Sequence, residues 1–261
     1  MTDGPFVTTE VDGRVLRVRL NRPDRLNAVS EELYADFEAA LERAAGQTDV
    51  GAVLLTAEGR AFCAGADLKA HADRARTPAE RRAYVWAGQR VCRFLQQLPQ
   101  PVVAGVQGYA IGAGAEIALS CDVVVAASDL QLRLPEVGLG TFVGGGISQR
   151  LPLLVGQLRA KQILLLGRPV SGEEAATWGL ATEAVAPDEV ERRAAELAEY
   201  LAAQPERSLR MAKSALNRAG SLAPDEALTQ EAEALLELMG TADWERGVQG
   251  FAGDRGNGEG R

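Results

Sequence analysis

The pattern of hydrophobic and polar residues predicts strands separated by helices through the first two thirds of the chain. Residues 15–20 alternate apolar and polar side chains, which is typical of a half-buried strand. Residues 50–56 and 101–106 are short, nearly continuous apolar runs, which are typical of buried strands. Further strands are predicted at 122–126, 130–134 and 180–185.

Capping residues indicate where the intervening helices begin. Ser30 precedes two glutamates, which favour the positive end of a helix, and apolar residues then recur on one face as far as Gly46. Thr77-Pro78-Ala79-Glu80 is a capping box with proline at the first helical position, and it predicts a helix to about Leu98. A second capping box begins at Ser171, and a short buried helix is predicted at 114–121.

The alternation of strands and helices indicates an α/β fold with largely parallel strands. The last third of the chain differs, because after about residue 187 the pattern predicts only helices, at 187–203, 206–219 and 225–239. This helical end is too small to bury its own apolar faces, so we expect it to pack on the main domain or on another subunit. We therefore divide the chain into a core with the candidate active site, residues 1–195, and a helical oligomerisation region, residues 196–261.

Composition and charge narrow the class of protein. The 261 residues include 28 Lys and Arg against 36 Asp and Glu, and the net charge of -8 argues against nucleic-acid binding. The three cysteines are widely spaced and odd in number, so neither a disulfide framework nor a zinc site is expected. No apolar run is long enough for a membrane span, and the first residues lack the apolar core of a signal peptide. A cytoplasmic protein without membrane contact is expected.

The sequence excludes several common catalytic motifs. The third glycine of a dinucleotide fingerprint is replaced by Ile117, and neither a GxxxxGK[ST] phosphate loop nor a GxSxG elbow is present. The chain has a single histidine, which excludes paired-histidine metal sites. No metal site is expected.

Two carboxylates have unusual neighbours. Glu116 lies among small and apolar residues, and Glu136 follows Pro135 in an apolar stretch. Burying a carboxylate is costly unless it is paired or functional, so the two are candidates for a general acid and base with raised pKa values. The alternative is that each caps a helix or pairs with an arginine.

Two turns rich in small residues, Ala64-Gly-Ala-Asp67 and Gly112-Ala-Gly114, each follow a predicted strand. Small residues at such positions leave backbone N–H groups uncovered, and these groups suit an anion or a developing oxyanion. Glycine is also common in ordinary turns, so the presence of two such turns is better evidence than either one alone.

These residues, with others in the same order, resemble the crotonase (enoyl-CoA hydratase/isomerase) superfamily from about residue 11 to 255. The resemblance implies an α/β spiral of ββα units with a helical C-terminal region that forms trimers, two of which commonly form a hexamer. The stretches that match are Leu20-Asn-Arg-Pro23, Leu26-Asn-Ala28, Ala61–Lys69, Pro101–Val106, Gly108–Glu116, Cys121-Asp122, Pro135-Glu136, Gly144–Leu151 and Ala175–Leu180.

The resemblance also implies roles for particular residues. The backbone N–H groups of Ala66 and Ala113 form an oxyanion hole for a thioester carbonyl. Glu116 and Glu136 match the two catalytic glutamates of enoyl-CoA hydratases, and we assign Glu116 to the water and Glu136 to the Cα proton. The substrate is an acyl-CoA thioester, and no separate cofactor is implied. The residues expected to contact the substrate or its CoA moiety are Arg25, Ala64, Asp67, Leu68, Lys69, Gly112, Gly144 and Arg255.

Some positions depart from the superfamily pattern. The middle residue of the second turn is commonly Gly and here is Ala113, and Leu132-Arg133-Leu134 replaces a Phe-Gly-Gln-like run. The C-terminal stretch Gly253-Asp254-Arg255 lacks a lysine that relatives often carry. The main prediction is hydration of a 2-enoyl-CoA or the reverse dehydration. The alternatives are an enoyl-CoA isomerase, a decarboxylase, a dehydratase of a specialised pathway, and a non-catalytic scaffold or RNA-binding relative.

Overall fold

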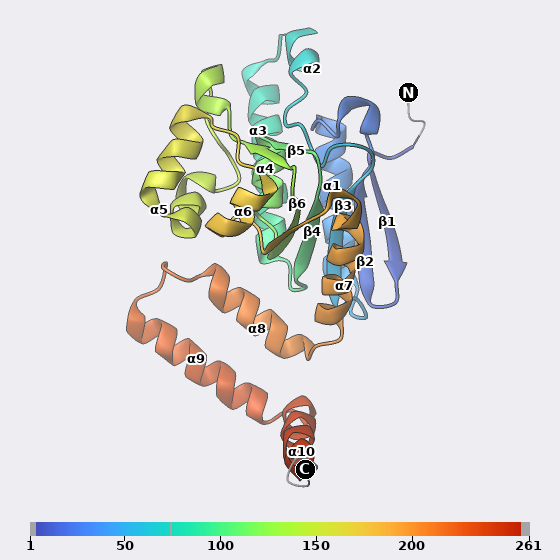
Figure 1. The fold of residues 1–261 in the computed structure, drawn as a ribbon, viewed down its shortest axis with the longest axis vertical. Coiled ribbons are helices and arrows are strands. Elements are labelled where there is room, and N and C mark those ends of the chain that lie inside the picture. The colour runs from blue at the N-terminus through green and yellow to red at the C-terminus, as the bar shows by residue number, and fades with distance from the viewer. Residues whose placement is uncertain (1–3, 74, 257–261) are drawn as a thin grey trace. The chain divides into compact units, whose positions relative to one another are not determined.

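A computed structural model describes residues 4–73 and 75–256 (Figure 1). The chain divides into two compact units, Met1–Ala203 and Gln204–Arg261. The boundary predicted after residue 195 lies within helix α7, Val190–Ala202, which packs on the strands of the first unit. Within the described residues, no helix is both long and apolar enough to cross a bilayer.

The first unit contains a six-stranded sheet with the order β1-β2-β3-β4-β6-β8. Only the β1–β2 hairpin is antiparallel, and every other neighbouring pair is parallel. This arrangement confirms the predicted α/β fold with largely parallel strands. The strands are β1 Val7–Asp12, β2 Val15–Leu20, β3 Ala52–Ala57, β4 Val102–Val106, β6 Val123–Ala127 and β8 Glu183–Val185.

A second, two-stranded sheet pairs β5, Tyr109–Ile111, with β7, Gln131–Arg133, in parallel. Cys63 forms an isolated bridge with Ala110 on this sheet, and the N–H of Ile111 donates to the carbonyl of Cys63 at 3.0 Å. The segment after β3 is therefore hydrogen-bonded to the segment after β4.

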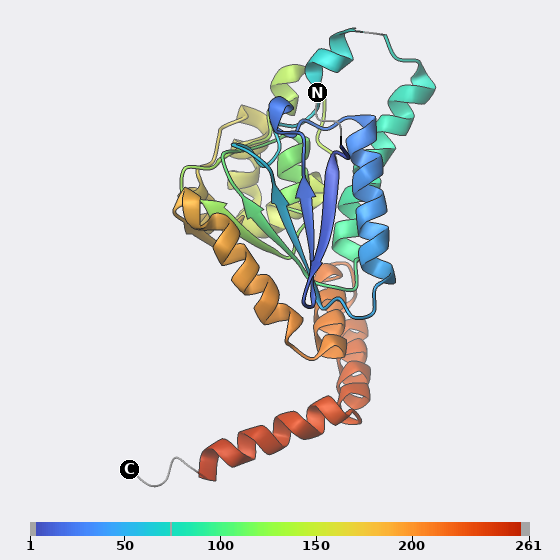
Figure 2. The same cartoon turned by 90° about the vertical axis from the view of Figure 1, so that its right-hand side faces the viewer.

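Helices cover both faces of the main sheet. Figure 2 shows α1, Glu31–Gly46, and α3, Pro78–Gln97, on one face and α7 on the other. Ser30 caps α1 and Thr77 forms a capping box with Glu80, as the sequence predicts. The other helical elements of this unit are η1 Pro23–Arg25, α2 Leu68–Asp73, α4 Ala113–Ala118, η2 Glu136–Leu139, α5 Ile147–Leu166, α6 Gly172–Trp178 and η3 Pro187–Glu189.

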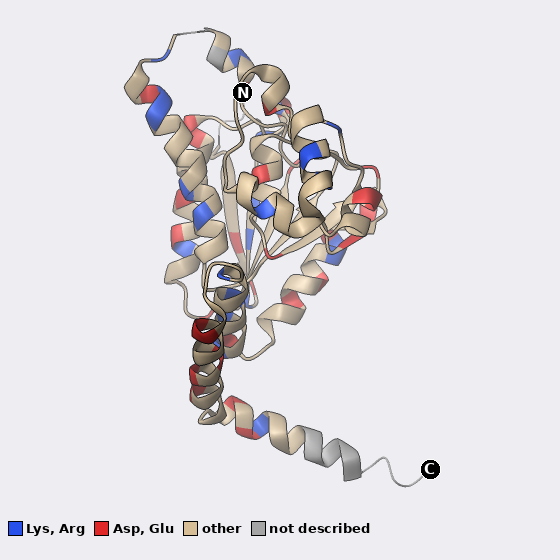
Figure 3. Cartoon of the chain, turned by 90° about the vertical axis from the view of Figure 1, so that its left-hand side faces the viewer, with Lys and Arg blue, Asp and Glu red and all other residues tan. Residues whose placement is uncertain are grey.

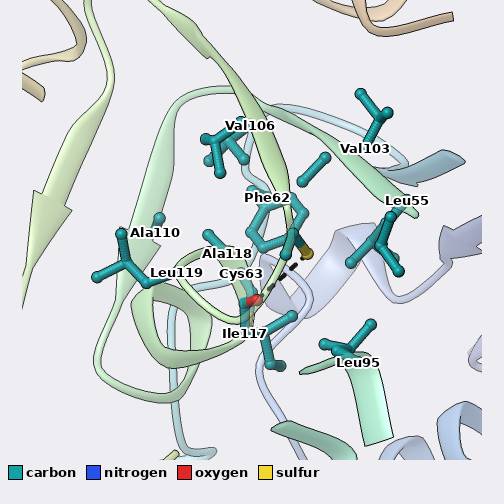
Figure 4. Close-up of a cluster of buried hydrophobic side chains, with 14 of the residues drawn as sticks. Leu55, Phe62, Cys63, Leu95, Val103, Val106, Ala110, Ile117, Ala118 and Leu119 are labelled. Carbon is teal, nitrogen blue, oxygen red and sulfur yellow. Dashed lines mark hydrogen bonds between the residues drawn. The ribbon is translucent and has the colours of Figure 1, made fainter. Parts of the chain in front are cut away.

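The hydrophobic core fixes the start of the loop after β3. Phe62 is fully buried, and Figure 4 shows it among Leu55 of β3, Val103 of β4 and Ile117 of α4. Truncating a phenylalanine in such a core typically costs about 3–5 kcal/mol. Because Cys63 and the turn at residues 64–67 follow directly, this packing anchors them to two strands and a helix.

The second unit consists of α8, Glu206–Asn217, α9, Pro224–Met239, and α10, Ala242–Gly256. Large apolar side chains on it are exposed, including Leu216, Leu235 and Leu236. Figure 3 shows that both basic and acidic residues occur on the helices of the chain, and some of them form ion pairs such as Arg90–Glu38.

Candidate active site

The two turns predicted from sequence lie against each other. Gly65 has a φ of +89°, and a Cβ atom added there would be 2.6 Å from the carbonyl oxygen of Ile111 and 3.8 Å from the backbone nitrogen of Ala113. Only glycine fits such a close approach in this conformation. The backbones of the 64–67 turn and the 112–114 turn are therefore in direct contact.

The backbone N–H groups of Ala66 and Ala113 are available at this junction. Ala113 is the first residue of α4, where an N–H has no partner within the helix. Across residues 4–73 and 75–256, neither N–H donates to a protein acceptor. Both residues are half-buried, so two backbone donors remain for a ligand in a site with limited water access.

The loop after β2 holds the first turn from behind. Asn27 is fully buried with a φ of +55°, and its side chain donates to the carbonyls of Glu58 and Ala61 at 2.9 and 2.8 Å. The N–H of Ala64 donates to the carbonyl of Leu26 at 3.0 Å. Through these hydrogen bonds, the Leu26-Asn27-Ala28 segment supports the 64–67 turn, which lies almost 40 residues later in the sequence.

Glu116 lies in the first turn of α4 and is only 9% exposed. Its Oε1 accepts a hydrogen bond from the N–H of Gly144 at 2.6 Å. Burial raises the pKa of Glu116 to about 7, and the hydrogen bond from Gly144 opposes this shift while the nearby charge of Glu136 adds to it. A carboxyl with this pKa is partly ionised at neutral pH and can accept or release a proton.

Glu136 begins η2 and is 8% exposed. Its Oε1 lies 2.6 Å from the point that a Cβ on Gly112 would occupy, so the carboxyl group faces the second turn. Its Oε2 is buried and has no hydrogen-bond partner among the residues that the structure describes. Burial raises the pKa of this carboxyl above its ordinary value. Glu136 thus faces the second turn, and Glu116 lies in the short helix that begins at Ala113. Neither carboxylate forms an ion pair in the described part of the chain.

The residues expected to contact CoA are placed differently from one another. Arg25, Leu68 and Lys69 are exposed near the first turn. Ala64 is half-buried in that turn, and Gly112 and Gly144 contact the two carboxylates. Arg255 falls in the part of α10 whose side chains lie outside the described residues.

Asp67 is buried and engaged within the protein. It forms an ion pair with Arg22 at 2.9 Å and accepts a hydrogen bond from the N–H of Ala70 at 3.1 Å. Burial alone would raise the pKa of Asp67, but these two partners outweigh it and the pKa is lowered. Asp67 therefore fixes the start of α2 against the loop after β2.

Two glutamines near Glu116 were not identified from the sequence. The N–H of Gly145 donates to Oε1 of Gln89 at 3.2 Å, and Nε2 of Gln96 donates to the carbonyl of Gly145 at 3.3 Å. Together with Cys92 they have the spacing i, i+3 and i+7 of a single helix face. The sequence signal for these two glutamines is their position beside the buried apolar face of the helix, which consists of Val91, Cys92 and Leu95.

The chain is similar to known proteins over nearly its full length. A family model described as enoyl-CoA hydratase/isomerase matches residues 10–257. The chain is 35% identical to the short-chain-enoyl-CoA hydratase of Clostridium acetobutylicum, with 94% of each chain covered. It is 36% identical to the 2,3-dehydroadipyl-CoA hydratase of Escherichia coli, covering 91% of this chain and 92% of that one.

A solved structure gives the same result for the fold. The crystal structure of enoyl-CoA hydratase from Bacillus anthracis superposes with a TM-score of 0.90 at 33% identity, covering 95% of this chain and 96% of that chain. The extent of these matches over nearly the full sequence establishes the family. The chain belongs to the enoyl-CoA hydratase/isomerase family of enzymes, within the crotonase superfamily.

Proposed function

We propose that this chain adds water across the α,β double bond of a 2-enoyl-CoA thioester, or removes it in the reverse direction. The observation that carries the proposal is the placement of two buried carboxylates, Glu116 and Glu136, at the turn whose backbone N–H, like that of Ala66, has no protein acceptor among the described residues. Hydration requires a base for the water, an acid for the Cα proton and donors for the thioester oxygen. One site offers all three.

In the proposed reaction, the thioester oxygen accepts hydrogen bonds from the N–H groups of Ala66 and Ala113. Ionised Glu116 takes a proton from water as the oxygen attacks Cβ, and negative charge develops on the thioester oxygen as an enolate. Glu136 in its protonated form then delivers a proton to Cα. The two carboxyl groups influence each other's titration, so their pH dependence belongs to the pair.

The environment of each carboxyl group supports the assignment of Glu116 as the base and Glu136 as the acid. Gly144 donates to Glu116 and so favours the ionised form that a base needs. Glu136 has a buried oxygen to which no described residue donates, and this favours the protonated form that an acid needs. We further propose that Arg25, Ala64, Leu68 and Lys69 lie along the CoA moiety, because they surround the first turn.

Hydration is tested by the loss of absorbance of the conjugated thioester. The substrates should include a short-chain enoyl-CoA and a dicarboxylic enoyl-CoA, because the names of the two relatives point to these classes. Glu116→Gln and Glu136→Gln should each reduce kcat by at least about a hundredfold, the usual contribution of a general acid or base. Exposed Glu42→Gln provides a matched control and should retain full activity.

Near-normal turnover in either site variant would remove that residue from the mechanism. If the wild-type enzyme moves the double bond without taking up water, the chain is an isomerase. If it acts on none of the thioesters, the non-catalytic alternative is favoured.

A further inference from the structure

One face of α3 clamps the glycine turn that supports Glu116. Gln89 accepts from the N–H of Gly145 at 3.2 Å, and Gln96 donates to the carbonyl of the same residue at 3.3 Å. Between them, Sγ of Cys92 lies 3.0 Å from the point that a Cβ on Gly145 would occupy. Helix α3 therefore binds both the N–H and the carbonyl group of Gly145.

This clamp acts on the residue next to Glu116's donor. The N–H of Gly144 donates to Oε1 of Glu116 at 2.6 Å, and Gly145 is its immediate neighbour in the chain. Fixing Gly145 restricts the peptide plane from which that N–H points, because consecutive peptide units share only two soft dihedral angles. A continuous set of contacts thus runs from Gln89 through the glycine turn to the carboxyl group.

The amide group of Gln89 also lies near the carboxyl group of Glu116, on the other side of Gly144. Its Oε1 must point to Gly145, because an N–H can only donate, so its Nε2 points the other way. A Cβ on Gly144 would lie 3.0 Å from that Nε2 and 2.9 Å from Oε2 of Glu116, so the two atoms flank the same small space. Among the described residues, Nε2 donates to no protein acceptor.

We propose that Gln89 is a positioning residue for Glu116, holding its donor turn through Oε1 and supplying a hydrogen-bond donor beside its Oε2. The proposal rests on the function proposed above, in which Glu116 is the base. The donor at Nε2 stands where a water molecule between Gly144 and the carboxyl group would be held. Gln96 secures the same turn from its carbonyl side and also donates to Oγ of Ser120 at 3.2 Å.

The thiols and phenols around Glu116 stay neutral near neutral pH. Burial raises the pKa of the Cys63 and Cys92 thiols to about 12. It also raises the pKa values of Tyr34 on α1 and Tyr84 on α3. Arg150 of α5, which donates to the carbonyl of Leu119, carries the cation that lowers the pKa of Cys92. Glu136 is the other carboxyl group in the site, and its charge adds to the rise in the pKa of Glu116.

The test compares Gln89→Ala and Gln89→Met with wild type and with Gln97→Ala, a control on the exposed face of the same helix. Methionine keeps approximately the volume of glutamine and removes both the oxygen acceptor and the nitrogen donor of its amide group. Each Gln89 variant should lower kcat by about tenfold, as for the loss of one hydrogen bond, with KM changed less than about twofold. The acid limb of the pH profile should move to higher pH, because a weaker Gly144 bond stabilises ionised Glu116 less. Gln97→Ala should match wild type.

A second measurement does not depend on turnover. The pKa of Glu116, followed by carboxyl-carbon NMR and assigned with Glu116→Gln, should rise in both Gln89 variants. If wild type hydrates no thioester but this pKa still rises, the proposed function fails and the positioning contact stands. If the Met variant keeps wild-type kcat and an unchanged Glu116 pKa, Gln89 has no positioning role, whatever the Ala variant does.

Discussion

The carboxyl group of Glu116 is held between opposing effects. Removal from water favours its neutral form, whereas the N–H of Gly144 favours its ionised form. The result is a pKa of about 7 rather than the ordinary 4.5. A single residue therefore has its proton affinity matched to neutral pH by burial and one backbone hydrogen bond.

This raised pKa carries a cost in stability at neutral and basic pH. Folded Glu116 binds a proton more tightly than unfolded Glu116, so its contribution is fully present below pH 4.5 and is lost as pH rises through about 7. Glu116→Gln should therefore be more stable than wild type at pH 8, by up to about 3 kcal/mol. At pH 4 the two should be nearly equal.

Urea unfolding at the two pH values measures this difference. Glu174→Gln serves as the control, because that carboxylate pairs with Arg168 and has a lowered pKa. Its substitution should not stabilise the protein at pH 8. If the Glu116→Gln variant and wild type have the same free energy of unfolding at both pH values, burial does not raise the pKa of Glu116.

At the scale of elements, the start of α4 supplies a donor that a substitution can remove cleanly. Ala113 is the first residue of this helix, a position where proline is well tolerated because its N–H is not needed by the helix. Ala113→Pro should therefore fold but lose the donor, and kcat should fall by about 10²–10³, as for other lost oxyanion donors. Ala113→Gly keeps the N–H and should retain activity.

Circular dichroism and oligomer size would establish that both Ala113 variants are folded. The thioester hydration assay then compares their kcat values. Full activity in folded Ala113→Pro would mean that the thioester oxygen is bound elsewhere, and the placement of the reaction between the two turns would be wrong.

Elements with strong local signals were predicted well from the sequence. The caps at Ser30, Thr77 and Ser171 mark the starts of α1, α3 and α6. The hairpin strand β1 was missed, because Val7 is the only fully buried residue in it and its pattern is weak. β5 has three residues and is defined by its pairing with β7 rather than by its own pattern.

The candidate site was predicted only in part, for a related reason. Glu116, Glu136 and the two turns have visible local signals, namely acids among apolar residues and small residues after strands. The roles of Asn27, Arg22 and Gln89 arise from contacts with residues more than 30 positions away. No local pattern encodes such contacts, so they became evident only from the fold.

At the scale of the molecule, apolar surface remains uncovered on both units. On α5, Leu158 is 84% exposed, and on α9, Leu236 is 74% exposed. Contiguous exposed apolar side chains on helices favour association. The exposed apolar surface predicts self-association, and the resemblance to the crotonase superfamily implies a trimer or, more commonly, a hexamer. We therefore expect the mass of such an assembly by light scattering at micromolar concentration. A monomeric mass under these conditions would contradict the prediction.

The wide separation in sequence of Glu116 and Gly144 has a consequence during synthesis. Glu116 leaves the ribosome 28 residues before the donor that binds it, and contacts between distant segments form only after the entropy of loop closure has been overcome. Until then the emerging chain carries Glu116 as a hydrated, ordinary acid that is fully ionised at neutral pH. The raised proton affinity of Glu116 therefore appears only after the chain has been made at least as far as Gly144 and has folded around the carboxyl group.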